Sequence, residues 1–215
     1  MDYRAAIIGG TGVGDLLLAK GTRAIHIPTK FGLVRARDLG GNVLVLARHG
    51  AGHKLPPSGV NYTALSEALR LLRIEYCFST AAVGSLDSSM PVGALCVCSD
   101  LLDVSGRESV RFASTVEHCD MTHPFALSAR SKLIEAAKSA GIDISEEGVY
   151  VCVNGPRYET PAEIQAIRIL GGQLVGMTAG TEAVAMREAG IKYACLAIVT
   201  NYATGLQESP LSHDE

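Results

Sequence analysis

The sequence has no tryptophan, and aromatic residues make up only 5% of its 215 positions. It also lacks the G-x-x-x-x-G-K-[S/T] phosphate loop, the G-x-S-x-G nucleophile motif and the H-E-x-x-H zinc motif. These absences leave no signature of covalent nucleophilic catalysis. No apolar run approaches the roughly 20 residues of a transmembrane helix, so we do not expect a membrane protein.

An excess of basic residues is missing too, because 19 Lys and Arg face 22 Asp and Glu for a net charge of −3. This balance argues against a nucleic-acid partner. The N-terminus enters an apolar segment directly, without the layout of a signal peptide. No C-x-x-C pair occurs, and most of the six cysteines lie in apolar segments. Such cysteines are typical of reduced core residues, and they predict a cytoplasmic protein.

Apolar strand-like segments alternate with helical patterns along the chain. Strands are expected at 4–8, 42–47, 76–80, 95–98, 148–153, 174–175 and 193–200, with a hairpin at 26–35 and helices at 64–72, 124–140, 160–170 and 181–189. Alternation of this kind predicts an α/β fold with a central mixed β-sheet flanked by helices. Since the length suits one domain and no linker is visible, we expect residues 1–215 to form a single domain.

The stretch 153–182 contains the clearest sequence signals for the position of the functional site. The signal for its first helix is strong, because Thr160 suits an N-cap, Pro161 the first helical position and Glu163 the closing residue of a capping box. The loop before this helix carries Tyr158 and Glu159, and the next predicted strand, 174–175, leads into Met177 and Thr178. Ligands of α/β sheets bind at the carboxyl ends of strands, so we expect the functional site here.

The first predicted strand runs into Gly9-Gly10-Thr11-Gly12. A glycine turn at this position lets backbone N–H groups approach an anion, with the Thr11 hydroxyl beside them, although an ordinary tight turn explains it equally well. The dinucleotide-binding fingerprint is not met, because the glycine spacing differs and no acidic residue follows at the required distance. A nicotinamide-dependent oxidoreductase is therefore not expected.

Arg48 and His49 end the next strand, and both donors suit an oxyanion, although an ordinary polar loop remains an alternative. His49 and His53 do not suggest a metal pair, because the glycines around them disfavour a helix. The polar segment 103–124 contains His118, Cys119, Asp120 and His123, whose spacing matches no recognised zinc site. We expect no metal here, and we expect this segment to serve as a loop lid or an interface.

Six short motifs occur in one order along nearly the whole chain: I-G-G-T-G at 8–12, L-A-R-H-G at 46–50, V-N-Y at 60–62, G-P-R-Y-E-T at 155–160, G-M-T at 176–178 and T-N at 200–201. Each is weak alone, but the ordered set resembles the nucleoside phosphorylase family, in the branch of methylthioadenosine phosphorylase and trimeric purine nucleoside phosphorylase. The S-G-R-E segment at 105–108 is most similar to the methylthioinosine phosphorylases.

The resemblance implies phosphorolysis of a purine nucleoside, with inorganic phosphate as co-substrate and no cofactor or metal. It implies phosphate contacts from Thr11, Arg48, His49 and Thr178, helped by the backbone near Ala82. It implies that Met177 lies against the ribose, that Tyr158 stacks on the purine and that His53 lines the 5′ side. It also implies a homotrimer, or a dimer of trimers, in which His118 reaches this pocket from a neighbouring subunit.

Base selectivity follows from donor and acceptor chemistry at the positions that the resemblance indicates. The adenosine-cleaving branch has Asp-x-Asp where this chain has Asn201 and Ala203, and it has a threonine where this chain has Ala81. Asn201 donates to N7 and O6 of a 6-oxopurine without needing an extra proton, and an ionised Glu159 accepts from N1–H. An alternative for Glu159 is electrostatic support of the following helix. Asn201 and His49 are the predicted catalytic residues.

We therefore expect a phosphorylase of inosine, guanosine or 5′-methylthioinosine that yields the free purine base and (methylthio)ribose 1-phosphate. Two alternatives remain open: a 5′-methylthioadenosine phosphorylase, and a non-catalytic homologue that keeps the fold. Family members continue into a long C-terminal helix that covers the 5′ side of the nucleoside. This sequence ends at its expected first turn, near residues 211–215, so we expect that helix to be absent.

Overall fold

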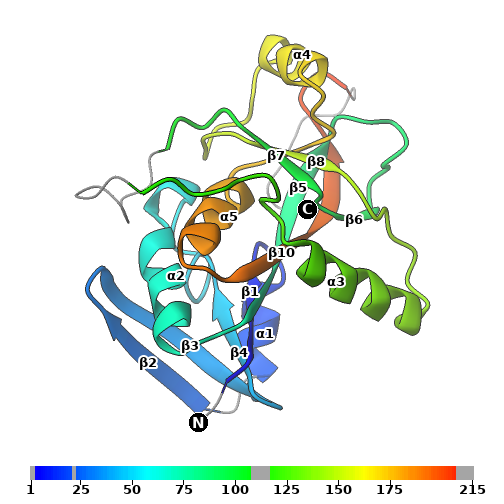
Figure 1. Cartoon of the computed structure of the whole chain (residues 1–215). Helices are drawn as coiled ribbons and strands as arrows, with labels where there is room; N and C mark the ends of the chain where they lie inside the picture. Colours follow the sequence, from blue (N-terminus) through cyan, green and yellow to red (C-terminus); the bar gives the residue numbers. More distant parts are fainter. Residues whose placement is uncertain (1–2, 21–22, 108–116, 207–215) are drawn as a thin grey trace.

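The computed structural model describes residues 3–20, 23–107 and 117–206 (Figure 1). The strands are β1 Ala5–Gly9, β2 Arg23–Thr29, β3 Gly32–Gly40, β4 Val43–Ala47, β5 Tyr76–Ser85, β6 Leu95–Val97, β7 Asp100–Asp103, β8 Val149–Cys152, β9 Leu174–Gly176 and β10 Lys192–Tyr202. The helices are α1 Gly14–Lys20, η1 Pro57–Gly59 (a 3-10 turn), α2 Tyr62–Leu71, α3 Leu127–Ala140, α4 Pro161–Ile169 and α5 Ala179–Glu188.

The sheet is organised around β5, which runs through the middle of the molecule. Its first half pairs in parallel with β1, its last two residues pair antiparallel with β9, and β10 lies parallel to it along almost its whole length. The strand order is β2-β3-β4-β1-β5-β9-β8-β7, with β10 also paired to β5 and β6 paired to β10. Parallel and antiparallel pairs both occur, which confirms the predicted mixed sheet.

Helices cover both faces of the sheet, and β10 shows how the sequence divides between the two faces. Tyr193 and Cys195 belong to the large core beneath α5, whereas Ala194 packs in a separate cluster with Ala126 and Ala129 at α3. Alternate side chains of a strand point to opposite faces, so α5 and α3 lie on opposite sides of β10. Helices α2 and α5 lie side by side on the same face (Figure 1).

The predicted N-terminus of α4 is confirmed in detail. Thr160 Oγ1 accepts a hydrogen bond from Glu163 N at 3.2 Å, and Thr160 N donates to Glu163 Oε2 at 2.7 Å. This reciprocal pair is the capping box expected from the sequence. It fixes the start of α4 at the top of Figure 1, and with it the end of the loop between β8 and α4.

The hairpin β2–β3 and the alternation of strands and helices are also confirmed, but two strands are longer than predicted. Residues 81–85, which follow the predicted strand 76–80, continue β5, and β10 extends through Asn201 to Tyr202. The two strands pair with each other over these residues, with one register shift near Asn201. Pairing of this kind depends on a distant segment, so small residues alone do not signal it.

Three elements have no counterpart in the sequence analysis. Helix α1 is only seven residues long and follows the glycine turn, η1 is a single 3-10 turn, and β7 lies between the predicted strand 95–98 and the polar segment 103–124. Within the described ranges, no helix has the length and apolar character needed to cross a bilayer. Residues 108–116 and 207–215 lie outside the described residues, and the latter range includes the expected first helical turn at 211–215.

Candidate active site

One pocket, with a volume of about 330 Å³, opens where the carboxyl ends of several strands meet. It receives residues that follow β1, β4, β8 and β9 together with the last residues of β5 and β10. Its lining is formed by Thr11, Arg48, His49, His53, Pro57, Ala81, Ala82, Val83, Gly84, Pro156, Tyr158, Glu159, Val175, Gly176, Met177, Thr178, Thr200, Asn201 and Ala203.

Every residue proposed for the site from the sequence lines this pocket except His118. His118 is exposed on the surface of the described chain. Two parts of the pocket are named here after the roles that the sequence predicts for their residues. The phosphate side comprises Thr11, Arg48, His49, Ala82 and Thr178, and the base side comprises Tyr158, Glu159, Asn201 and Ala203.

The glycine turn after β1 brings the phosphate side together because Gly10 has no side chain. A Cβ at Gly10 would lie 2.5 Å from Thr80 O and 2.6 Å from Arg48 Nη1, so any larger residue would displace one of them. Gly10 N donates to Thr80 Oγ1 at 3.0 Å, which ties the turn to the neighbouring strand β5. Thr11 therefore reaches the pocket next to the Arg48 guanidinium.

Arg48 is 2% exposed and is held by a carboxylate that the sequence analysis did not assign to the site. Its Nε donates to Glu182 Oε2 and its Nη2 to Glu182 Oε1, both at 2.8 Å, while Nη1 donates to Thr80 O at 2.8 Å. Burial alone would lower the pKa of Arg48, but the attraction and hydrogen bonds of Glu182 raise it well above its ordinary value. Arg48 is therefore permanently charged and fixed in direction.

His49 is buried and neutral at physiological pH. Burial lowers its pKa to about 4, and the nearby positive charge of Arg48 acts in the same direction, against a hydrogen bond to Leu55 that favours protonation. That bond joins His49 Nδ1 to Leu55 O at 2.8 Å, and since a carbonyl oxygen only accepts, the proton is assigned to Nδ1. Nε2 is then a hydrogen-bond acceptor. The ring of His53 lies 4.2 Å away between centroids.

The segment after β9 is positioned by two side chains from other elements. Tyr150 Oη accepts hydrogen bonds from Thr178 N at 3.3 Å and from Ala179 N at 3.2 Å. Arg107 Nη1 donates to Met177 O at 2.7 Å and to Thr181 Oγ1 at 3.1 Å. Met177 and Thr178 are thus held by hydrogen bonds from Arg107 and Tyr150, so their place in the pocket does not depend on a bound ligand.

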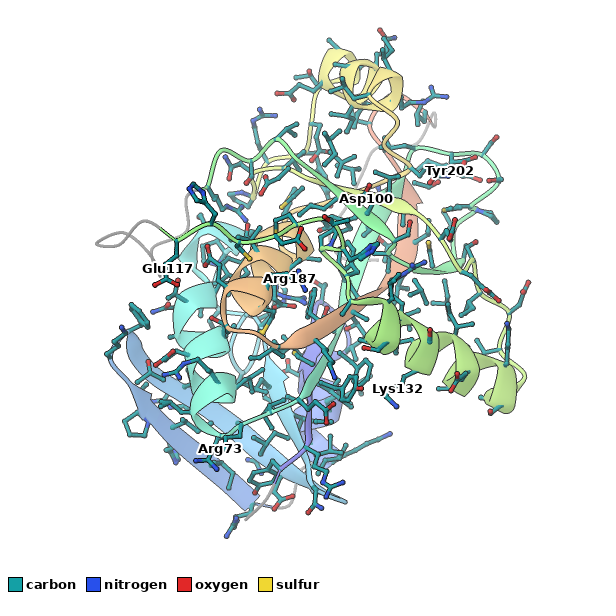
Figure 2. All side chains as sticks on the ribbon, in the orientation of Figure 1. Arg73, Asp100, Glu117, Lys132, Arg187 and Tyr202 are labelled. Carbon is teal, nitrogen blue, oxygen red and sulfur yellow. The ribbon has the colours of Figure 1, made fainter. Side chains whose placement is uncertain are left out.

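The base side depends on short-range contacts. Asn201 Nδ2 donates to Tyr202 O at 2.9 Å, and its Oδ1 accepts from Thr200 Oγ1 at 2.9 Å. One amide hydrogen of Asn201 and the second lone pair of its carbonyl remain for a ligand. Figure 2 shows Tyr202 at the end of β10 that lies toward α4.

Glu159 is 8% exposed and lies between Tyr158 and the capping residue of α4. Burial raises the pKa of its carboxyl above the ordinary value, and the neighbouring charge of Glu163 adds to the increase. This pKa shift favours the protonated form more than the sequence analysis assumed. A partner that donates a hydrogen bond to the carboxylate would offset the cost of burying its charge.

Ala203 and Ala81 are both buried in apolar surroundings. Ala203 packs with Val153, Val175 and Ile164 in a cluster beneath α4. This surrounding would make an aspartate at position 203 costly unless it were neutralised. The apolar surroundings of Ala203 are therefore consistent with the absence of the second aspartate of the Asp-x-Asp pattern in this chain.

No group of three or more potential metal-binding side chains occurs among residues 3–20, 23–107 and 117–206. The six cysteines are free, and five of them are buried. The sequence analysis gave no place in the site to Pro57, which lines the pocket, or to Thr80, Tyr150 and Glu182, which hold residues that line it. Glu182 offered a signal, because it occurs three residues after Ala179 and four before Met186, on the apolar face of its helix.

Together these features define an α/β protein with a pocket in which a cluster of anion-binding donors adjoins an amide and a carboxylate. The chain belongs to the phosphorylase superfamily, whose family model matches residues 4–215.

Its relatives include the 6-oxopurine nucleoside phosphorylase of Pyrococcus furiosus, 41% identical over 224 residues, with 99% of this chain and 84% of the relative covered. A protein of Pseudomonas syringae pv. tomato named "Probable S-methyl-5'-thioinosine phosphorylase" is 40% identical, with 93% and 85% covered. Among solved structures, methylthioadenosine phosphorylase from Schistosoma mansoni in complex with adenine superposes with a TM-score of 0.89 at 32% identity, covering 99% of this chain and 83% of that one.

Proposed function

We propose that this protein cleaves the glycosidic bond of 6-oxopurine nucleosides with inorganic phosphate, releasing the purine base and (methylthio)ribose 1-phosphate. The observation that carries the proposal is a single pocket that unites the donors Thr11, Arg48 and Thr178 with Asn201 and Glu159. Relatives named 6-oxopurine nucleoside phosphorylase support the same substrate class.

In the proposed reaction, Thr11, Arg48 and Thr178 hold phosphate so that one of its oxygens faces C1′ of the ribose. A bond forms between that oxygen and C1′ while the bond from C1′ to N9 breaks, and its electron pair passes to the purine. Negative charge therefore develops on the base, and the free amide hydrogen of Asn201 stabilises it at N7. Fixed donors contribute most in such a reaction, because they need no reorganisation as the charge moves.

Selectivity for 6-oxopurines rests on Asn201 and Glu159. A 6-oxopurine presents an acceptor at O6 and a donor at N1–H, whereas adenine presents the opposite pattern. The N1–H donor would pay part of the cost of ionising the buried Glu159, and adenine offers no such donor. The 5′ side, next to His53 and Met177, accepts either a hydroxyl or a methylthio group in this proposal.

A panel of inosine, guanosine, adenosine and their 5′-methylthio forms, each with and without phosphate, tests the proposal. We expect phosphate-dependent release of hypoxanthine or guanine with much higher kcat/KM than release of adenine. Equal or higher kcat/KM for 5′-methylthioadenosine would favour the second candidate, methylthioadenosine phosphorylase, which the structural likeness to the Schistosoma enzyme also supports. Base release from none of them would favour a non-catalytic homologue.

We further propose that the active form is a homotrimer, or a dimer of trimers, in the cytoplasm, and that no metal or other cofactor takes part. The exposed position of His118, away from the pocket of its own chain, supports a role at a neighbouring subunit's pocket. Light scattering at working concentration should give three or six chains. In a mixture of His118→Ala and Arg48→Met chains, neither active alone, activity should reappear through mixed trimers.

A further inference from the structure

Glu182 fixes the direction of the Arg48 guanidinium without lining the pocket itself. An arginine has five N–H groups. Three of them are engaged by Glu182 and Thr80, which leaves one hydrogen on each terminal nitrogen. Rotation of the guanidinium would break both bonds to Glu182, so these two hydrogens keep one orientation.

The carboxylate is itself held in place. Glu182 is fully buried in the first turn of α5, and Tyr193 Oη donates to its Oε1 at 2.7 Å. Tyr193 Oη also lies 2.6 Å from Ser79 Oγ, on β5. A chain of hydrogen bonds thus runs from β5 through β10 and α5 to Arg48, and it joins strands whose carboxyl ends build the pocket.

Stability alone does not account for this ion pair. Burying two charges costs about as much as their attraction returns, and apolar residues of similar size often stabilise such a site better. The pair also removes the net charge of Arg48, and His49 is neutral beside it. Among these residues, the anion would therefore meet directed N–H and O–H donors and no net positive charge.

We propose that Glu182 is a positioning residue for the phosphate co-substrate, acting through Arg48. The inference rests on the proposed phosphorolysis. In the reaction, Glu182 keeps the two remaining Arg48 N–H groups aimed into the pocket, and it prevents the guanidinium from closing around phosphate in an unproductive orientation. Glu182 touches neither phosphate nor nucleoside.

The test is Glu182→Gln, compared with the matched control Glu67→Gln. Glu67 accepts the same two-pronged contact from Arg70, with both distances 2.8 Å, on α2 and outside the pocket. We expect Glu182→Gln to lower kcat/KM for phosphate by at least about tenfold, the scale for misplacing one charge-assisted donor. The KM for inosine at saturating phosphate should stay within about twofold, and Glu67→Gln should change neither quantity.

A double-mutant cycle with Arg48→Met separates positioning from a general structural role. If Glu182 acts through Arg48, adding Glu182→Gln to Arg48→Met should lower phosphate kcat/KM by no more than about twofold further. Full additivity of the two losses would overturn the proposal. A lower melting temperature of Glu182→Gln with unchanged phosphate kinetics would overturn it as well.

Tyr193→Phe provides a milder variant should Glu182→Gln fail to fold, because it removes only one hydrogen bond from the carboxylate. It should raise the KM for phosphate severalfold and leave the KM for inosine unchanged, and an unchanged phosphate KM would count against the proposal. Calorimetric titration with inorganic phosphate distinguishes failure of the positioning role of Glu182 from failure of the proposed phosphorolysis. Weaker phosphate binding by the Glu182 variant, in a protein that fails to cleave nucleosides, would refute the proposed function and retain the positioning role.

Discussion

The phosphate side and the base side of the pocket are held by contacts of different range. Arg48 is fixed by Glu182, 134 positions away in the sequence, whereas Asn201 hydrogen bonds to the residues directly before and after it. The phosphate side is therefore built by the packing of four elements, and the base side by one strand end and one loop. This difference predicts that substitutions on the phosphate side damage both folding and activity, whereas those on the base side alter selectivity in a stable protein.

The largest effect should come from Arg48→Met. Glu182 would remain buried without its partner, so the free energy of unfolding should fall by about 3–5 kcal/mol. Phosphate-dependent kcat/KM should fall by about 10²–10³ through loss of a fixed donor. Urea unfolding and steady-state kinetics measure the two losses.

Arg70→Met is the matched control for this substitution, because Arg70 makes the same contact at a side chain that is 49% exposed. Its unfolding free energy should change far less than that of Arg48→Met. If folded Arg48→Met cleaved nucleosides at the wild-type rate, the assignment of Arg48 to phosphate binding would be wrong.

Asn201→Asp should have a large effect on selectivity and a small one on stability. A carboxylate cannot donate to N7 or O6 unless it takes up a proton, so the ratio of kcat/KM for inosine over adenosine should fall by at least about tenfold. Substrate panels for the variant and the wild type measure the ratio. The phosphate KM should stay unchanged, and a large rise in it would show that the two sides are not independent.

Glu159→Gln tests the base side through pH. Burial raises the pKa of Glu159 in the folded protein above its unfolded value, so the ionised carboxylate lowers stability at neutral pH. This cost disappears as pH falls through the folded pKa. Glu159→Gln should therefore be more stable than wild type near pH 7, with a difference that shrinks in acid.

The same titration should appear in the kinetics. Wild-type kcat/KM for inosine should decline as pH falls through the folded pKa of Glu159, since a protonated carboxyl no longer accepts from N1–H as a carboxylate. The Glu159→Gln variant should lack that acid limb. An identical acid limb in both proteins would assign it to another group.

The smallest effect should come from Thr160→Ala, which removes half of the capping box of α4. Loss of such a cap costs about 1 kcal/mol of stability. Because α4 follows directly after Tyr158 and Glu159, the KM for inosine should rise slightly while the phosphate KM stays constant. A change confined to the phosphate KM would contradict the division of the pocket into two sides.

Local patterns in the sequence predicted the mixed sheet, the hairpin and the start of α4. They were less successful where a residue's surroundings come from a distant segment. The predicted strand 76–80 stopped short of the small residues 81–85, but pairing with β10 keeps these residues in β5. Helix α1 was missed because a short segment after a glycine turn offers too few positions for periodicity to be visible.

The predicted site residues other than His118 line one pocket, because they lie in or after the last residues of strands whose carboxyl ends meet at one edge of the sheet. Glu182 was missed, although its place among Ala179, Ala183 and Met186 on one helix face was a signal. A charged residue on an apolar face indicates a buried partner, but it does not say which one. The roles of the individual pocket residues remain predictions.

The sequence by itself determined which chemical groups stand at the strand ends, because hydrophobic periodicity and turn residues are local properties of the chain. Only the tertiary structure decided their electrostatic state. The positive charge of Arg48 is balanced by the carboxylate of Glu182. Burial keeps His49 neutral and shifts Glu159 toward its protonated form. Charge and protonation depend on every group within a few ångströms, and packing brings those groups together from distant parts of the sequence.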